Sequence, residues 1–195
     1  MRSHREFAGP LLLLVAACAA PAEQPSEPTS DEVAALCETQ PCRQPGDFEI
    51  QFDGGRHIET IGNAQPYIQN DEISIKPGES LVIEGTVRDR RLASLRVQHG
   101  TPTAAPVLIL EFEQNGSERT LTIKNSFDVA FKFHIDMRFA GKDAWYETSS
   151  CGLGPSPSAD TPFYTNVELW SDPIAELILF DFRVVEPDEA FQCVY

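Results

Sequence analysis

Residues 127–139 read FDVAFKFHIDMRF, and this stretch places an apolar side chain at every odd position. Successive side chains of a β-strand point to opposite faces, so the seven apolar side chains would share one face. The even positions are mostly charged and predict a solvent-exposed opposite face: Asp128, Ala130, Lys132, His134, Asp136 and Arg138. Because a strand with one wholly apolar face needs a core to cover it, we expect an all-β domain built around this stretch.

The chain before this stretch shows the same period of two in segments that are separated by turn signals. The alternating or apolar segments are residues 47–53, 56–61, 73–75, 81–87, 93–97, 107–112 and 120–123. In the first of them Phe48, Ile50 and Phe52 share one face, which predicts a half-buried strand. The residues between segments favour tight turns: Gly54-Gly55, Pro77-Gly78 in a type II turn, and Asn115-Gly116 in a type I′ hairpin turn.

The chain after this stretch completes the pattern. A long connection rich in Gly, Ser and Pro spans residues 140–162, and two further strands are expected at 163–170 and 174–185. Roughly ten strands with almost no helix are typical of an antiparallel two-sheet β-sandwich of jelly-roll or immunoglobulin-like topology. A lipocalin-like barrel is less favoured, because residues 48–52 lack the Gly-x-Trp sequence expected early in such a barrel.

The N-terminus has the pattern of an export signal. Two arginines precede an apolar run at residues 7–17 that is too short to span a bilayer. Val15-Ala16-Ala17-Cys18 resembles the bacterial lipobox, whose cysteine is acylated before cleavage. The resemblance implies that residues 1–17 are a lipoprotein signal peptide and that the mature chain starts at a lipid-anchored Cys18. Ala19, where some lipoproteins carry aspartate, further implies transfer to the outer membrane.

The rest of the chain divides into three predicted parts. Residues 18–30 are rich in Pro, Glu and Ser and predict a disordered tether with almost nothing to bury. Residues 31–46 predict one short helix, for which Thr29 and Glu32 have the spacing of a capping box, followed by a disulfide loop. Residues 47–195 are expected to form the β-sandwich domain, which is large enough to bury one core.

Charge restricts the partners that the protein can have. The formal net charge is −15, and removal of residues 1–17 leaves −16. Such a chain repels phosphate backbones and anionic headgroups, so we expect no nucleic-acid partner. The expected membrane contact is made by the acyl chains on Cys18, whose buried methylenes each contribute roughly 0.8 kcal/mol.

Four cysteines remain once Cys18 is assigned to lipid: Cys37, Cys42, Cys151 and Cys193. An even set in an exported protein predicts two disulfides, for which three pairings are possible. We favour Cys37 with Cys42 and Cys151 with Cys193, because the first two are close in sequence and Pro41 turns the chain between them. A zinc site is less favoured, since no matching second pair or nearby histidine accompanies the C-x4-C spacing.

No residue pattern is typical of an enzyme. His134 and Asp136 could form an acid and base pair, but Lys132 and Arg138 beside them favour an exposed face of alternating charge. The sequence contains no Gly-x-Ser-x-Gly and no His-Glu-x-x-His. We therefore expect no catalytic residue and no cofactor.

The acidic side chains also have a simple interpretation. Several of them share one face of a predicted strand and are interpreted as solvent-exposed rather than as a glycosidase pair: Asp47, Glu49 and Asp53, and Glu111 and Glu113. Asp53-Gly54-Gly55 and Asn70-Asp71-Glu72 offer oxygen ligands in turns, but neither approaches a calcium-loop signature. We expect no metal site.

Four late aromatic residues are the candidate ligand-binding group. Trp145 and Tyr146 fall in the long connection, while Tyr164 and Trp170 fall at even positions that we expect to point away from the core. Exposed aromatic rings can stack on sugars or anchor a protein partner. The sequence thus predicts a lipid-anchored envelope β-sandwich protein with a binding or structural role. A carbohydrate-binding module is the alternative, and a secreted hydrolase is a further one.

Overall fold

The computed structural model describes residues 30–98, 106–158 and 163–193, and the prediction of an all-β protein is confirmed. All strand pairings in the described residues are antiparallel, and the two helices there are short: α1 (Ser30–Thr39) and α2 (Pro187–Ala190). Helix α1 confirms the helix expected near residue 31. The predicted signal peptide, Cys18, the tether up to residue 29 and Thr29 of the capping box lie outside the described residues.

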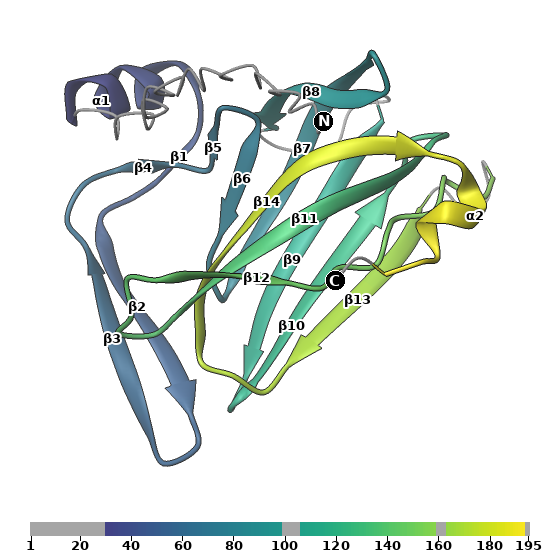
Figure 1. Cartoon of the computed structure of the whole chain (residues 1–195). Helices are drawn as coiled ribbons and strands as arrows, with labels where there is room; N and C mark the ends of the chain where they lie inside the picture. Colours follow the sequence, from purple (N-terminus) through teal and green to yellow (C-terminus); the bar gives the residue numbers. More distant parts are fainter. Residues whose placement is uncertain (1–29, 99–105, 159–162, 194–195) are drawn as a thin grey trace, which may run out of the picture.

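The strands of the described chain follow one another in this order: β1 (Cys42–Arg43), β2 (Gly46–Phe52), β3 (Gly55–Ile61), β4 (Gln65–Pro66), β5 (Ile68–Gln69), β6 (Glu72–Ile75), β7 (Glu79–Arg88), β8 (Arg91–Val97), β9 (Val107–Asn115), β10 (Glu118–Asn125), β11 (Ala130–Phe139), β12 (Trp145–Thr148), β13 (Tyr164–Trp170) and β14 (Ile174–Val185). Their arrangement is shown in Figure 1.

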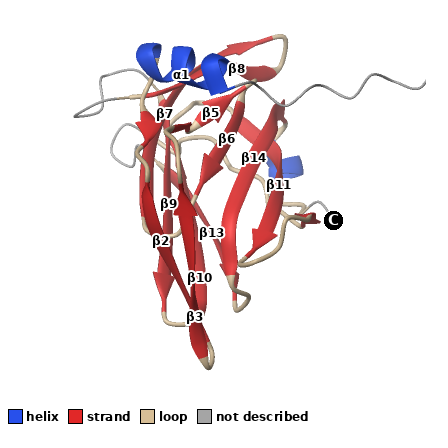
Figure 2. Cartoon of the chain, turned by 90° about the vertical axis from the view of Figure 1, so that its left-hand side faces the viewer, coloured by secondary structure: helices blue, strands red, loops and turns tan. Residues whose placement is uncertain are grey.

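Ten strands form one hydrogen-bonded sheet in the order β12-β11-β14-β8-β7-β9-β10-β13, and β6 pairs with β14 and β5. The sheet is weakly joined at its middle, where β14 and β8 share the single residue pair Arg183 and Arg91. In the side view of Figure 2, β11 and β14 lie apart from β7 and β9. Buried residues from both halves belong to one core cluster, such as Leu110 of β9 and Leu179 of β14. Both halves therefore contribute side chains to one core.

Strand β11 contributes the apolar face that its sequence predicts. Phe131, Phe133 and Ile135 are fully buried, and Met137 and Phe139 are half-buried against the same core. The regular strand begins at residue 130, so the first three residues of the alternating stretch precede it. The period of two thus identified the core strand but not its first residue.

The opposite face of β11 is less exposed than predicted. Ala130 is buried, and the side chain of Arg138 is only 15% exposed. Arg138 is covered because Glu59 of β3 binds its guanidinium. A contact with a distant hairpin therefore removes from solvent a charged position that alternation alone assigns to water.

The predicted hairpin around Gly54-Gly55 is present as β2 and β3, which form their own two-stranded sheet. Of the apolar face expected on β2, Ile50 is buried, whereas Phe48 is half-buried and Phe52 is 36% exposed. The reason is the position of the hairpin, which contacts the tip of the β9–β10 hairpin. There Arg119 donates to the Gln51 carbonyl and Gln114 accepts from the Gln51 amide.

The other turn predictions hold with one correction. Gly78 has a φ of 91°, and the Glu79 amide bonds to the Lys76 carbonyl, as the predicted type II turn requires. The β9–β10 hairpin is also present, but Glu118 pairs with Asn115, so its central residues are Gly116 and Ser117. Positive φ at Gly116 but not at Ser117 fits a type II′ turn instead of the expected type I′ turn.

Both disulfides have the favoured pairing. Cys37 of α1 is bonded to Cys42 of β1, and Cys151 after β12 is bonded to Cys193 after α2. The first bond closes a short local turn, whereas the second fastens the last described residues to the connection between β12 and β13.

The core of β11 gives the first prediction. Phe133 is 1% exposed and stacks on Phe182 with ring centroids 5.1 Å apart. Phe133→Ala should lower the free energy of unfolding by about 3–5 kcal/mol, because it removes buried apolar surface and leaves a cavity. Urea denaturation measures this loss. Lys132→Ala, on the half-exposed face, is the control and should change stability by less than about 0.5 kcal/mol. A similar loss for both variants would contradict the buried face.

The disulfides give the second prediction. Their cysteines are 5 and 42 residues apart in sequence. Loop-closure entropy predicts that replacing Cys37 and Cys42 by alanine costs about 2 kcal/mol, and replacing Cys151 and Cys193 about 4 kcal/mol. Urea denaturation of the two double variants compares them directly, and the reverse order of stability would show that chain entropy does not govern these bonds.

Candidate functional site

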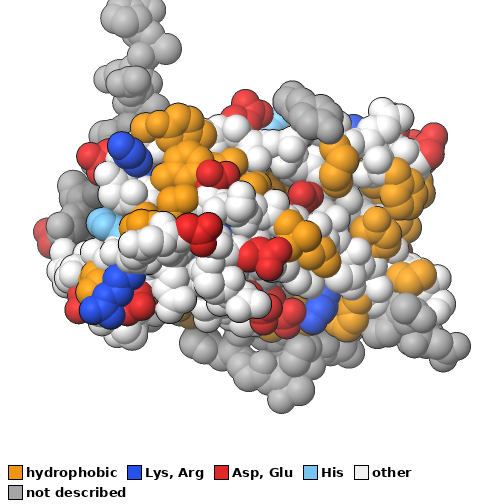
Figure 3. Space-filling view, turned by 90° about the horizontal axis from the view of Figure 1, so that it is seen from below, with side chains coloured by type: hydrophobic (Ala, Val, Ile, Leu, Met, Phe, Trp, Pro, Cys, Tyr) orange, Lys and Arg blue, Asp and Glu red, His pale blue; other side chains and the backbone are white. Residues whose placement is uncertain are grey.

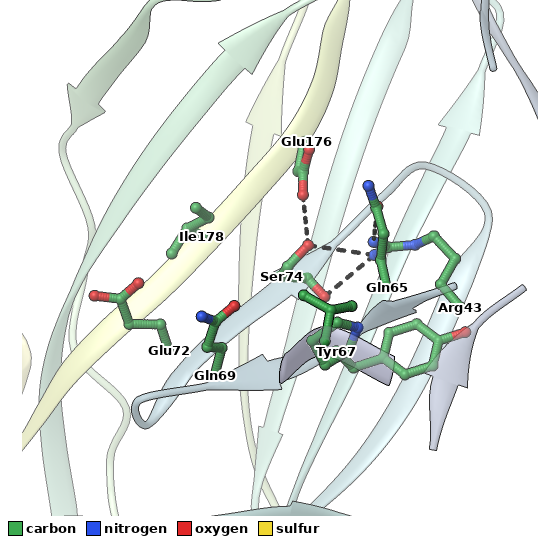
Figure 4. A pocket seen from close by; sticks show the side chains of 10 residues that line it. Arg43, Gln65, Tyr67, Gln69, Glu72, Ser74, Glu176 and Ile178 are labelled. Atoms are coloured by element: carbon green, nitrogen blue, oxygen red, sulfur yellow. Dashed lines mark hydrogen bonds between the residues drawn. The ribbon is translucent and has the colours of Figure 1, made fainter. Parts of the chain in front are cut away.

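We call α1, β1, β4 and β5 the N-terminal segment; it comprises residues 30–69 without the β2–β3 hairpin. This segment lies against β6 and β14. Strand β1 pairs with β4, and β5 pairs with β6. The Gln40 amide adds a hydrogen bond to the Ile68 carbonyl at 2.9 Å. A cavity of about 270 Å³, here called the pocket, remains between this segment and the two strands. Its polar lining is shown in Figure 4 and comprises Arg43, Gln65, Gln69, Glu72, Ser74 and Glu176.

Arg43 stands at one end of the pocket and is only 2% exposed. Its Nε and Nη2 atoms donate to the two carboxylate oxygens of Glu79 at 2.6 and 2.7 Å. Such a bidentate pair is among the strongest charge-assisted contacts. The guanidinium also lies over the Tyr67 ring, 5.1 Å from its centroid, and Nη1 donates to Gln65 at 3.3 Å. Arg43 thus fastens β1 to the start of β7.

A second group of buried charges lies beside the first. Lys76 Nζ donates to Glu176 at 2.8 Å and to Glu59 at 3.2 Å. Arg138 Nη2 donates to the same two carboxylates, at 2.9 Å to Glu176 and 2.5 Å to Glu59. Ser74 joins both groups, because its hydroxyl donates to Glu176 and accepts from Arg43. These contacts connect β3, β6, β11 and β14.

Together these six ionised side chains form what we call the buried charge network: Arg43, Lys76, Arg138, Glu59, Glu79 and Glu176. Three positive charges face three negative charges, so the network is neutral as a whole. Removing ions from water costs several kcal/mol each, and only close opposite charges with good geometry repay that cost. The network is therefore stable only while all its members are present.

Glu176 shows how strongly the network favours ionised groups. Burial raises the pKa of its carboxyl, but the Lys76 charge and the hydrogen bonds from Lys76, Ser74 and Arg138 outweigh burial and hold the pKa at about 2. Burial likewise lowers the pKa of Arg138, yet its hydrogen bonds to Glu59 and Glu176 raise it overall. Both groups stay charged at neutral pH.

The far end of the pocket is different, because two polar side chains there are not hydrogen-bonded within the part of the chain that the structure describes. Gln69 and Glu72 are directly opposite each other in the β5–β6 hairpin, and no hydrogen bond joins either side chain to the described residues. Burial and then the nearby Asp136 charge raise the pKa of Glu72. Asn70 and Asp71 between them both have positive φ, which matches a type I′ turn.

Trp145 and Tyr146, the first two of the candidate aromatic residues, form the start of β12 at one edge of the sheet. As neighbours in a strand they point to opposite faces. Trp145 lies under the Arg138 guanidinium at 5.7 Å, and Tyr146 packs on Phe139 at 5.2 Å. They are 39% and 47% exposed. This pair does not present two rings on one surface.

Tyr164 and Trp170 begin and end β13, and the prediction that they point away from the core is wrong. Both are half-buried against it, and Trp170 meets Phe112 edge to face at 6.5 Å. The cause is register, because the even residues of β13 pair with the buried odd residues of β10. The exposed side chains are Val167 and Leu169 instead, at 49% and 60%.

The four aromatics therefore lie on the two terminal strands of the sheet order, two on β12 and two on β13, and do not form one stacking platform. Seen from below, apolar side chains appear at several separate places, with acidic side chains between them (Figure 3). The sugar-stacking surface that the sequence suggested would have to use these residues singly.

His134 and Asp136 lie on the outer face of β11, and His134 is held by its neighbours. Its Nδ1 atom is 3.2 Å from Glu147, and its Nε2 atom accepts from Arg183 at 3.1 Å. Burial and the Glu147 charge raise the pKa of Asp136, while His134 lowers it in part. With both ring nitrogens in contact with charged neighbours, His134 is oriented as part of a surface network.

Four of the other acidic candidates have protein partners. Asp47 accepts from Thr60, and Glu49 is paired with Arg56. Glu111 is paired with Lys124 at 2.9 Å, and Asp71 accepts from the backbone amide of Leu95. Within the residues that the structure describes, no three His, Cys, Asp or Glu side chains converge as metal ligands.

The residues of the pocket gave weak signals in the sequence. Glu176 is a single charge in the apolar stretch Ile174–Phe180, and Lys76 follows the alternating apolar strand β6. A lone charge in a core strand predicts a buried partner, but the partner comes from a distant element. Gln69 and Glu72 flank the Asn-Asp pair of a hairpin turn, and that turn was the only local sign that their side chains are adjacent.

Comparison of the chain with protein-family models, with curated proteins and with solved structures found no match. In the described part of the chain, neither helix has the length and apolar character needed to cross a bilayer. What the pocket can do follows from its own side chains: it can accept hydrogen bonds and donate them, and its strong charges already neutralise one another.

The network gives the third prediction. The pKa of Glu176 falls from 4.5 to about 2 on folding, so its stabilising contribution is complete above about pH 4.5 and is lost as pH falls toward 2. This difference corresponds to roughly 3 kcal/mol. Glu176→Gln should lower the free energy of unfolding by about that amount at pH 7, and the gap from the wild type should close toward pH 2.

Urea denaturation between pH 2 and pH 7 measures both curves. The matched control is Glu113→Gln, which changes an exposed carboxylate and should follow the wild-type curve. Parallel curves for wild type and Glu176→Gln across this range would show that Glu176 is not stabilised by the network.

Proposed function

We propose that this protein is an exported, lipid-anchored envelope protein whose β domain binds a ligand or partner at the pocket and catalyses no reaction. The observation that carries this proposal is that the polar side chains at the two ends of the pocket differ in their hydrogen bonding. At one end, all strong charges are used by one another in the buried charge network. At the other, the Gln69 and Glu72 side chains make no hydrogen bond to the described residues, and no histidine is among the described residues that line the pocket. Such a site can hold a molecule through hydrogen bonds.

Two observations support location outside the cytoplasm. Both disulfides pair all four cysteines that follow Cys18, as is typical of oxidising compartments. The lipobox resemblance at residues 15–18 places an acylated cysteine twelve residues before α1. With Ala19 in the next position we infer sorting to the outer membrane, with residues 18–30 as the tether between the lipid and the domain.

We also infer that residues 47–195 form a β-sandwich, of jelly-roll or immunoglobulin-like topology, in which the two halves of the ten-stranded sheet are the layers. Two findings support this: the single residue pair that joins β14 to β8, and the common core that both halves contribute to. A sandwich carries the N-terminal segment on an outer face, where a bound molecule does not disturb the core.

Carbohydrate binding is the second candidate function, and one observation favours it at the pocket. The amide of Gln69 and the carboxylate of Glu72 are side by side and uncommitted, and planar polar groups of this kind suit hydroxyl-rich ligands. The separated aromatics of β12 and β13 would then contribute at most secondary contacts.

The lipid anchor gives the fourth prediction. Cys18→Ser should move the protein from the membrane fraction to the soluble fraction and abolish incorporation of labelled palmitate, because no acceptor thiol remains at the lipobox. The matched control, Ser26→Ala in the tether, should stay in membranes and keep the label. Unchanged membrane association of Cys18→Ser would contradict the anchor, and thermal unfolding of both variants would verify that the domain is intact.

A further inference from the structure

We infer that the pocket takes one uncharged polyhydroxylated ring, that is, a single monosaccharide unit of a neutral sugar or glycan. This inference rests on the proposed binding function and specifies the ligand class of that site. It follows from four properties of the pocket: its charge balance, its free hydrogen-bonding groups, its apolar surfaces and its size.

Charge balance disfavours an anionic ligand. Among the described residues, the positive group that lines the pocket is Arg43, and it is already bonded to Glu79. Lys76 and Arg138 do not line the pocket, and each is bonded to both Glu59 and Glu176. A phosphate or a carboxylate could bind Arg43 only by displacing Glu79, which would leave a buried charge without its partner. The uncommitted charge, Glu72, is itself negative. An acidic ligand would therefore meet repulsion and no available cation.

The free hydrogen-bonding groups suit adjacent hydroxyls. Gln69 and Glu72 are a directly opposed pair in the β5–β6 hairpin, so their side chains lie on the same face. The carboxylate accepts two hydrogen bonds, and the carboxamide both donates and accepts. Neighbouring hydroxyls of a sugar offer donors and acceptors in the same plane. Gln65 adds an amide NH2 group at the opposite end, because Arg43 uses only its oxygen.

Apolar groups stand beside these polar ones, as a sugar requires. Ile178 of β14 lies next to Gln69 and Glu72 in the close view, and Tyr67 lies under Arg43 (Figure 4). Val33 of α1 and Pro66 of β4 complete the lining. The C–H faces of a sugar ring can pack on such surfaces while its hydroxyls reach the polar rim, a combination that a free ion cannot use.

Size and rigidity restrict the ligand further. The cavity of about 270 Å³ is below the range of about 300–1,000 Å³ that is usual for drug-sized ligands. It therefore admits one ring and not a buried oligosaccharide. Both walls are fastened in advance, one by the Cys37–Cys42 disulfide and the Arg43–Glu79 pair, the other by the sheet. A preorganised site loses little entropy on binding.

The test compares rings that differ in charge but not in size. Isothermal titration calorimetry of the whole mature chain would use the methyl glycosides of glucose, galactose and mannose, together with the matching glucosamine and glucuronic acid series. We expect at least one neutral glycoside to bind with about millimolar affinity and at least about tenfold more tightly than its acidic counterpart.

Variants then locate the binding and separate hydrogen bonding from charge. Gln69→Ala and Glu72→Ala should each weaken the neutral glycoside about tenfold or more. Glu72→Gln, which keeps a planar hydrogen-bonding group without the charge, should retain binding within about threefold. Glu113→Gln is the matched control for an exposed carboxylate elsewhere and should leave affinity unchanged. Thermal unfolding checks that every variant is folded.

Each contrary result has a distinct meaning. If an amine binds best and Glu72→Gln abolishes its binding, the pocket selects cations; the ligand class is then wrong, while the proposed binding function stands. Tightest binding of the acidic ring would overturn the argument from charge balance in the same way. If no probe binds, or if Gln69→Ala and Glu72→Ala change nothing, the ligand class and the pocket as a binding site both fail.

Discussion

The buried charge network is the contact on which the arrangement of the candidate site depends. Glu176 is its centre, since one carboxylate accepts from Lys76, Arg138 and Ser74 and so connects β14 with β6 and β11. Ions removed from water are costly, and this cost is recovered only with every partner in place. The network therefore specifies one position of the N-terminal segment against the sheet, and the pocket is the space that this position leaves.

Two contacts that follow one another along the chain hold the N-terminal segment: the Cys37–Cys42 disulfide and the Arg43–Glu79 ion pair. The Cys37–Cys42 disulfide sets the turn that leads from α1 into β1, so that Arg43 follows immediately in the strand. Arg43 then reaches Glu79 through two hydrogen bonds. The disulfide is local, whereas the ion pair spans 36 residues of sequence. A short turn thereby positions a long-range contact, and a segment with few apolar residues is held without a core of its own.

The same contacts distinguish the two carboxylates that line the pocket. Catalytic carboxylates usually have perturbed environments and free access to substrate. Glu176 is buried and accepts hydrogen bonds from three side chains, whereas Glu72 is exposed, its carboxylate makes no hydrogen bond to the described residues and it lies near the Asp136 charge. Gln69 beside it cannot ionise. At this end of the pocket, Gln69 therefore offers hydrogen bonds alone, while Glu72 offers hydrogen bonds and a negative charge.

Much of the fold followed from residue order alone. Alternation in residues 127–139 identified the core strand β11, and Pro77-Gly78 indicated the type II turn between β6 and β7. The number and spacing of the cysteines favoured the two disulfides that are present. Each of these features depends on residues that are near one another or few in number. The faces of Tyr164 and Trp170 could not be obtained in this way, since the register of β13 against β10 decides them.

The candidate site, like the faces of Tyr164 and Trp170, depends on contacts between residues that are distant in the sequence. Arg43, Glu59 and Glu176 are far apart in the sequence and have no local pattern in common, so only the folded chain brings their charges together. The sequence by itself predicted the all-β class, the type II turn at Pro77-Gly78 and the favoured cysteine pairs, because these depend on residues near one another or few in number. The tertiary structure decided which polar side chains are buried together and which stay free, because long-range electrostatic partners are chosen by three-dimensional packing and not by spacing along the chain.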